Sequence, residues 1–157
     1  MRIIAVDPGG TTGIARYDMD EELGVPVFTS FELPTMAALD AVRQTLETVK
    51  VDLLVCELFI IGTGTTRKTR AGSYAAIHSV GALMYLAHWY GVPFDGQAPT
   101  EKEFADNAKL AKLGWRRPSK GGHADDAARH LLVAAVKNRV IPASLFLEEE
   151  DVPVGDR

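Results

Sequence analysis

The sequence predicts an α/β domain in which helices flank a mixed five-stranded sheet whose first three strands are antiparallel. Two observations lead to this prediction. Unbroken apolar runs at 3–6 and 51–56 are typical of strands that are buried on both faces. Longer segments at 36–49 and 73–90 repeat apolar residues at helical spacing. The alternation of such strands and helices indicates a layered α/β architecture.

Length and composition fit one globular domain. The chain has 157 residues, of which 46% are hydrophobic and 24% charged, so a sizeable core is expected. We expect this domain to span residues 1–143, and the acidic residues 144–157 to form a mobile tail. The net charge of -4 does not by itself indicate a nucleic-acid-binding protein.

Cysteine content and targeting signals bear on the compartment. Cys56 is the single cysteine, which excludes a disulfide within the chain and suits a reducing cytoplasm. The sequence has no secretory signal pattern and no apolar run long enough to span a membrane. We therefore expect a cytoplasmic protein with no membrane partner.

The first apolar run ends on Asp7, which is followed by Pro8 and two glycines. Proline fixes φ and glycine permits close approach, so little bulk stands beside this carboxylate. Asp7 can therefore face a metal ion or a phosphate, or it can simply cap the turn. The opening is predicted to be a β-hairpin with a loop at 7–13 and a second strand at 14–17, followed by a third strand at 25–33.

The second apolar run ends in the same way, on Glu57. The C-terminal ends of parallel strands form the edge of an α/β sheet at which ligands bind. An exposed Glu at a strand end is common, but the shared pattern favours Asp7 and Glu57 lying together. The Gly/Thr-rich segment 62–72 is predicted to be a flexible loop beyond Glu57. Its cations are candidate phosphate contacts: Arg67, Lys68 and Arg70.

The helix predicted at 73–90 is apolar over much of its circumference, which indicates burial or a subunit interface. A short strand is predicted to start at 92–94, and Thr100 with Glu103 suggests a capping box at the next helix. A second basic cluster follows, comprising Lys102, Lys109, Lys112, Arg116, Arg117 and Lys120. Trp115 lies within it and either stacks on bases or packs inward.

The last predicted helix opens with His123 and Asp126, three residues apart and therefore on one face of its first turn. Acidic residues are favoured at helix starts by the helix dipole, which is sufficient to explain Asp125. If His123 and Asp126 point toward Asp7 and Glu57, the four side chains form a metal site.

Taken in order, these features resemble the RuvC-type Holliday junction resolvases of the ribonuclease H-like superfamily. The resemblance covers about residues 1–140 and includes the segment Pro99–Lys102, similar to a basic segment of that family. It rests on Val6-Asp7-Pro8-Gly9, on Glu57 after Val51–Cys56, and on His123-Ala124-Asp125-Asp126-Ala127-Ala128. It implies a ribonuclease H-like fold with these catalytic and metal-binding residues: Asp7, Glu57, His123 and Asp126.

Asp125 directly before Asp126 leaves two candidates for the last ligand. We favour Asp126, because the His-x-x-Asp spacing and the alanines that follow match the family. Oxygen ligands suit Mg²⁺ or Mn²⁺, and acidic clusters that cleave phosphodiesters usually hold two ions. We expect Asp7 to bridge two ions between Glu57 and Asp126, with His123 as a ligand or proton-transfer group.

The resemblance also implies a substrate and an assembly. Branched DNA would be cut to a 5′-phosphate and a 3′-hydroxyl, and the basic residues of both clusters would hold its phosphates. Two symmetric cuts require a two-fold homodimer, for which the helix at 73–90 is the expected surface.

Three different kinds of protein share parts of this pattern. The loop at 7–13 is also similar to the first phosphate loop of actin-like ATPases and sugar kinases. Those proteins need two lobes, whereas 157 residues provide one, so we expect no nucleotide cofactor. The second kind is a small nuclease of the same fold that acts on RNA. The third is a DNA-binding domain without catalytic activity.

Overall fold

The computed structural model describes residues 1–20, 25–59, 67–116 and 122–147. Five strands form one sheet in the order β3-β2-β1-β4-β5. The strands are β1 (Arg2–Asp7), β2 (Thr11–Asp20), β3 (Val25–Pro34), β4 (Leu53–Glu57) and β5 (Phe94–Gln97). The first three strands pair in antiparallel fashion, whereas β1 with β4 and β4 with β5 are parallel. The predicted mixed sheet is therefore confirmed.

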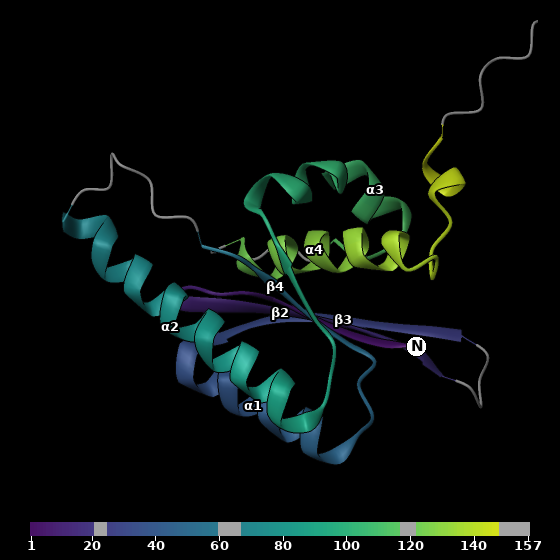
Figure 1. Cartoon of the computed structure of the whole chain (residues 1–157). Helices are drawn as coiled ribbons and strands as arrows, with labels where there is room; N and C mark the ends of the chain where they lie inside the picture. Colours follow the sequence, from purple (N-terminus) through teal and green to yellow (C-terminus); the bar gives the residue numbers. More distant parts are fainter. Residues whose placement is uncertain (21–24, 60–66, 117–121, 148–157) are drawn as a thin grey trace, which may run out of the picture.

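Helices cover both faces of this sheet. They are α1 (Thr35–Thr48), α2 (Arg67–Tyr90), α3 (Asn107–Lys112) and α4 (His123–Lys137), with 3-10 helices at Pro99–Phe104 and Ala143–Phe146. Figure 1 shows α1 and α2 side by side on one face, and α3 and α4 on the other. Among the described residues, none of these helices is long and apolar enough to cross a membrane.

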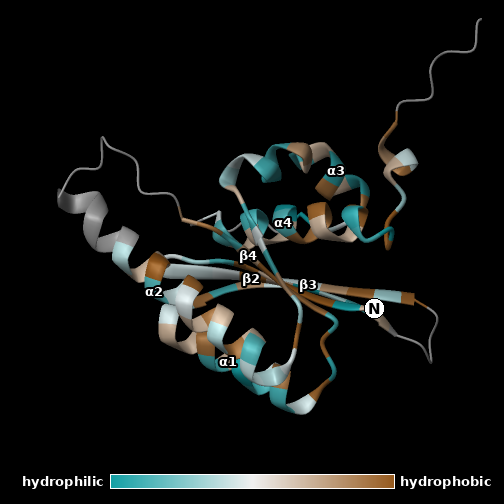
Figure 2. Ribbon diagram, viewed as in Figure 1, coloured by the Kyte–Doolittle hydropathy of each residue, from teal (hydrophilic) through white to brown (hydrophobic). Residues whose placement is uncertain are grey.

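Two hydrophobic cores result, because side chains of a strand alternate between the faces of a sheet. Ile3 and Ala5 of β1 join the core under α4, whereas Ile4 and Val6 join the core under α1 and α2. All four are at most 1% exposed. In Figure 2 the hydrophobic residues accordingly concentrate along the central strands. A strand buried on both faces explains why the sequence of β1 is an unbroken apolar run.

The opening hairpin is tighter than predicted. Strand pairing continues to Asp7 opposite Gly13, so the loop contains only residues 8–10. Thr12 stabilises it, because its hydroxyl donates to the carbonyl of Gly9 at 3.1 Å. The β-branched threonines at 11 and 12 favour strand over loop.

The prediction of a loop at 62–72 is wrong for residues 67–72, which are helical. Helix α2 begins at Arg67, and residues 62–66 lie outside the described part of the chain. Arg and Lys are good helix formers, which outweighs the loop tendency of the neighbouring threonines and glycine. The basic residues of this segment therefore belong to the first turn of a helix.

Two further local predictions need correction. Strand β5 starts at Phe94 rather than Val92, because Pro93 has no N–H to donate and contributes only its carbonyl, bonded to the Leu54 N–H at 2.9 Å. The capping box of Thr100 with Glu103 is replaced by another contact, in which the Ala98 N–H donates to Glu101 Oε1 at 2.8 Å.

The structured part of the chain includes residues beyond 143. Ala143–Phe146 forms a 3-10 helix, and Phe146 packs against the core under α4. The Phe146 and Phe104 rings meet edge to face at 6.3 Å. Residues 148–157 of the predicted tail lie outside the described part of the chain.

Candidate active site

Parallel pairing brings Asp7 and Glu57 to the same edge of the sheet. Val6 of β1 pairs with Cys56 of β4. Asp7 and Glu57 are the next residues on these two strands, so they lie at neighbouring strand ends. Glu57 in turn pairs with Gln97, the last residue of β5. Three neighbouring parallel strands therefore end on polar side chains at the edge where α/β proteins bind ligands.

Helix α4 starts directly against this edge. Gly13 of β2 allows the approach, because a Cβ atom at this position would lie 1.9 Å from the His123 carbonyl oxygen. Glu32 of β3 accepts a hydrogen bond from the Ala124 N–H at 3.1 Å, which satisfies one free N–H of the first helical turn. This contact of Glu32 is not foreseeable from the sequence pattern, because it joins residues far apart in the chain.

The approach places His123 beside Asp7. The His123 Nδ1 atom lies 2.7 Å from Asp7 Oδ2. Asp7 is only 7% exposed, and burial raises its pKa to about 6, with the nearby charge of Glu57 adding to the rise. The hydrogen bond with His123 opposes that rise. The carboxylate would therefore gain from any cation that neutralises it.

Lys102 joins the other two predicted carboxylates. Its Nζ atom lies 3.0 Å from Glu57 Oε2 and 2.8 Å from Asp126 Oδ2. Burial lowers the pKa of Lys102, but the bonds to Asp126 and Glu57 outweigh burial and raise it above its usual value. Burial likewise raises the pKa of Glu57, and hydrogen bonds from His130 and Lys102 more than reverse this. Lys102 and Glu57 are therefore held in their charged forms.

The two candidate aspartates of α4 differ in their surroundings. Asp126 contacts Lys102 and also pairs with Arg129, which donates a second bond to Asn107 Oδ1 at 2.7 Å. Asp125 is 8% exposed and belongs to the buried residues of the helix. Asp126 is thus the residue that shares a cation with Glu57.

Behind Glu57 lies a polar group that was not predicted from the sequence. His130 and Gln97 are both 0% exposed. His130 Nδ1 lies 2.7 Å from Gln97 Oε1, and His130 Nε2 lies 2.8 Å from Glu57 Oε2. The Gln97 side-chain amide donates to Asp95 Oδ2 at 2.9 Å. A signal existed in the sequence, since His130 is one turn beyond Asp126 and therefore lies on the same face of the helix.

The predicted phosphate-binding residues are dispersed. Lys102 lies within the carboxylate cluster, whereas Lys109 pairs with Asp106 at 2.8 Å and Lys112 donates to the Leu145 carbonyl at 2.7 Å. Arg116 is exposed. Arg117 and Lys120 lie outside the described residues, as do the side chains of Arg67, Lys68 and Arg70.

Trp115 packs inward rather than toward solvent. It is 6% exposed, and its ring stacks on Phe28 with centroids 4.6 Å apart and planes 5° from parallel. Base stacking by this residue is therefore excluded for the folded domain.

The donor set suits a divalent cation in its chemistry. The site contains three carboxylates and one imidazole in two contacting sets, Asp7 with His123 and Glu57 with Asp126 through Lys102. Carboxylate oxygens are preferred by Mg²⁺ and Mn²⁺. Within the described residues, however, no three acidic, His or Cys side chains form a ready-made metal cage. The Lys102 ammonium lies between Glu57 and Asp126, and His123 Nδ1 contacts Asp7 Oδ2. Lys102 thus supplies the positive charge between two of the carboxylates.

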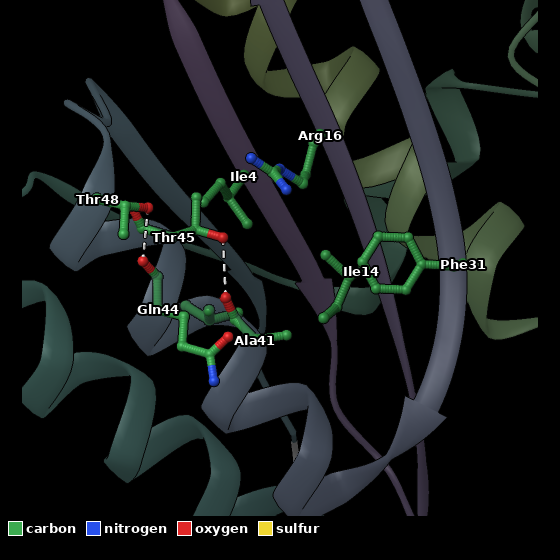
Figure 3. A pocket seen from close by; sticks show the side chains of 9 residues that line it. Ile4, Ile14, Arg16, Phe31, Ala41, Gln44, Thr45 and Thr48 are labelled. Carbon is green, nitrogen blue, oxygen red and sulfur yellow. Dashed lines mark hydrogen bonds between the residues drawn. The ribbon is translucent and has the colours of Figure 1, made fainter.

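A separate cavity of about 330 Å³ lies between α1 and the sheet. Figure 3 shows Arg16 beside this cavity, with Thr45 and Thr48 of α1 donating to the carbonyls of Ala41 and Gln44, each at 2.8 Å. None of the described residues that line it is acidic. This cavity therefore does not belong to the carboxylate cluster.

Comparison with known proteins identifies the fold. No family model matches the sequence, and no curated protein does. The structure is similar to RuvC of T. thermophilus solved in complex with a Holliday junction substrate, with a TM-score of 0.65, 16% identity and coverage of 89% of this chain and 96% of the other. A second Thermus thermophilus RuvC structure gives a TM-score of 0.59 at 17% identity, with the same coverage of 89% and 96%. The fowlpox virus Holliday junction resolvase gives 0.48 at 10% identity, covering 88% and 99%. The two RuvC structures, with TM-scores of 0.65 and 0.59, show that this chain has the ribonuclease H-like fold of RuvC, at low sequence identity to it.

Proposed function

We propose that this protein is a metal-dependent endonuclease that cuts Holliday junctions or related branched DNA. The observation that carries the proposal is that Asp7 and Glu57 end adjacent parallel strands, while Asp126 of a third segment is joined to Glu57 through Lys102. The similarity in fold to a RuvC that was solved with a Holliday junction substrate favours branched DNA over other phosphodiesters.

Each residue has a place in this proposal. Asp7 is the central metal ligand, Glu57 and Asp126 flank it, and His123 is the nitrogen donor or proton carrier 2.7 Å from Asp7. Mg²⁺ or Mn²⁺ bound by these groups would supply an activated water and stabilise charge on the leaving oxygen. Lys102 contributes a positive charge beside carboxylates that would otherwise repel the substrate phosphate.

The proposal includes a homodimer formed through α2. One face of this helix is exposed and partly aromatic, with Tyr74 59%, Tyr85 59% and Trp89 68% exposed. The Tyr85 and Trp89 rings stack with centroids 6.0 Å apart. Large exposed aromatic side chains on one helix are typical of a subunit interface, and two symmetric cuts require a two-fold assembly.

The test is a cleavage assay with Mg²⁺ or Mn²⁺ on four-way junction, flap, duplex and RNA-containing substrates. Asp7→Asn and Asp126→Asn should each reduce cleavage of the four-way junction by at least about a thousandfold, because each removes a carboxylate that stabilises the transition state. Binding of the junction in Ca²⁺, measured by fluorescence anisotropy, should remain.

Asp40→Asn is the matched control, since Asp40 lies on α1 with its side chain 65% exposed. This variant should cleave like the wild type. Normal cleavage by Asp7→Asn or Asp126→Asn would disprove the metal-site assignment. Preferential cleavage of the RNA-containing substrate would replace branched DNA with RNA in the proposal. If Asp125→Asn lost activity while Asp126→Asn kept it, Asp125 would be the metal ligand in place of Asp126.

A further inference from the structure

The buried pair of His130 and Gln97 has no role in the proposed chemistry. Both side chains are 0% exposed, and burying two such polar groups is unfavourable unless each is hydrogen-bonded. Their contacts form a chain from Asp95 through Gln97 and His130 to Glu57. The chain thus ends on a carboxylate of the candidate active site.

The orientation of each group in this chain is fixed by its neighbour. Asp95 accepts from the Gln97 amide NH₂, which turns the Gln97 carbonyl oxygen toward His130. That oxygen lies 2.7 Å from His130 Nδ1, and the opposite ring nitrogen, Nε2, lies 2.8 Å from Glu57 Oε2. A histidine held at both nitrogens has a fixed ring plane.

The contact also selects one oxygen of Glu57. His130 and Lys102 both contact Oε2, at 2.8 Å and 3.0 Å. Within the described part of the chain no hydrogen bond is made to Oε1, so this oxygen is the one available to a cation. Hydrogen bonds to the second oxygen of a metal-binding carboxylate orient it and tune its affinity.

We propose that His130, held by Gln97, is a positioning residue that fixes the Glu57 carboxylate so that Oε1 is presented to a divalent cation. This inference rests on the proposed metal-dependent function, which it deepens. His130, on the second turn of α4, would orient the Glu57 carboxylate without binding the metal ion itself.

The test uses two substitutions that each keep one half of the imidazole. In His130→Gln the side-chain amide nitrogen replaces Nε2 and can hydrogen-bond to Glu57. In His130→Asn the amide replaces Nδ1 and reaches only Gln97. Mn²⁺ binding to the full-length protein is measured by isothermal titration calorimetry for both variants, alone and combined with Glu57→Gln.

We expect His130→Asn to weaken Mn²⁺ binding about tenfold and His130→Gln to stay within about threefold of the wild type. In the Glu57→Gln background, His130→Asn should cause no further loss, because its effect passes through Glu57. The inference would be overturned if the Gln and Asn variants bound Mn²⁺ with equal affinity. It would also be overturned if His130→Asn weakened Mn²⁺ binding as much in the Glu57→Gln background as in the wild type, or if the wild type did not bind Mn²⁺.

Folding is checked by thermal unfolding of each variant. If His130→Asn does not fold, Gln97→Met replaces it, since this variant keeps His130 but removes the oxygen that orients the ring. We expect Gln97→Met to weaken Mn²⁺ binding, and unchanged binding would overturn the inference. The expected order of Mn²⁺ affinities without cleavage of branched DNA would leave this inference intact and reject the proposed substrate.

Discussion

Asp7 is the central residue of the proposed chemistry, and burial in the protein disfavours its charged form. Its carboxylate is buried at the end of β1, and burial raises its pKa to about 6. Among the described residues, the hydrogen bond to His123 and the charges of His123 and Lys102 oppose that shift. A carboxylate in this environment favours either a proton or a cation, which is the property that a metal ligand needs.

This shift predicts how stability depends on pH. Because the folded pKa of Asp7 lies above its ordinary value of 3.8, the folded state binds the proton more tightly than the unfolded state. The associated stability is fully present below pH 3.8 and is lost as the pH rises through about 6. At pH 8 without metal, the buried charge should cost about 3 kcal/mol.

Asp7→Asn should therefore raise the free energy of unfolding at pH 8 by up to about 3 kcal/mol and change it little at pH 4. Urea unfolding in the presence of EDTA at the two pH values measures the difference. Asp40→Asn, an exposed change, should show no such pH dependence. Equal effects of Asp7→Asn at both pH values would contradict the buried-charge explanation.

At the scale of elements, the site depends on how closely α4 approaches the hairpin of β1 and β2. Gly13 makes that approach possible, because even a methyl group there would overlap the His123 carbonyl. The same contact sets the distance between His123 and Asp7. The absence of a side chain at Gly13 thus determines how closely the first turn of α4 can approach the hairpin.

Gly13→Ala should accordingly destabilise the protein by about 3 kcal/mol, because backbone atoms have to move apart. Mn²⁺ affinity should fall as well, since His123 moves away from Asp7. Gly10→Ala is a matched control in the same hairpin: an added Cβ there has no atom within 4 Å. It should change stability by less than about 0.5 kcal/mol. Chemical denaturation of both variants checks this, and equal effects would show that the packing at Gly13 is not limiting.

The elements of the fold were predictable to the extent that they depend on local pattern. The unbroken apolar runs identified β1 and β4, and the two acidic residues after them lie side by side because parallel pairing is regular. The start of α2 was mispredicted, because the Gly/Thr-rich composition there outweighed a helix signal from Arg and Lys. Local composition does not reveal which of two such tendencies prevails.

The parts of the site that escaped prediction arise from contacts between distant segments. Lys102 was predicted to bind phosphate, but its place between Glu57 and Asp126 depends on a 3-10 helix packing against α4. His130 fits a helical pattern, and only the folded structure shows that it points at Glu57. Sequence spacing within one helix fixes a shared face, whereas partners across elements are set by tertiary packing.

At the scale of the whole molecule, the two faces of the sheet have different tasks. The face under α4 carries the carboxylate cluster, and the opposite face carries α1 and α2 (Figure 1). Helix α2 buries Leu83 and Ala87 against the sheet but leaves Tyr74, Tyr85 and Trp89 exposed to solvent. In the proposed dimer, this exposed surface of α2 would contact the second copy on the side of the sheet opposite α4, so the candidate site would stay open.

The dimer can be tested with one charge. Met84, 52% exposed, borders the aromatic face of α2, and Met84→Glu would place an unpaired carboxylate in the proposed interface. Because burying an unpaired charge is costly, the mass in solution should fall from twice 17.0 kDa to 17.0 kDa. Size-exclusion chromatography with light scattering measures this mass. Met36→Glu is the control, since Met36 is 71% exposed on α1 and should leave the dimer intact. If the Met84→Glu protein stays dimeric, the dimer interface lies elsewhere. If the wild type is monomeric, there is no dimer, and paired cleavage of a junction would require another source of two-fold symmetry.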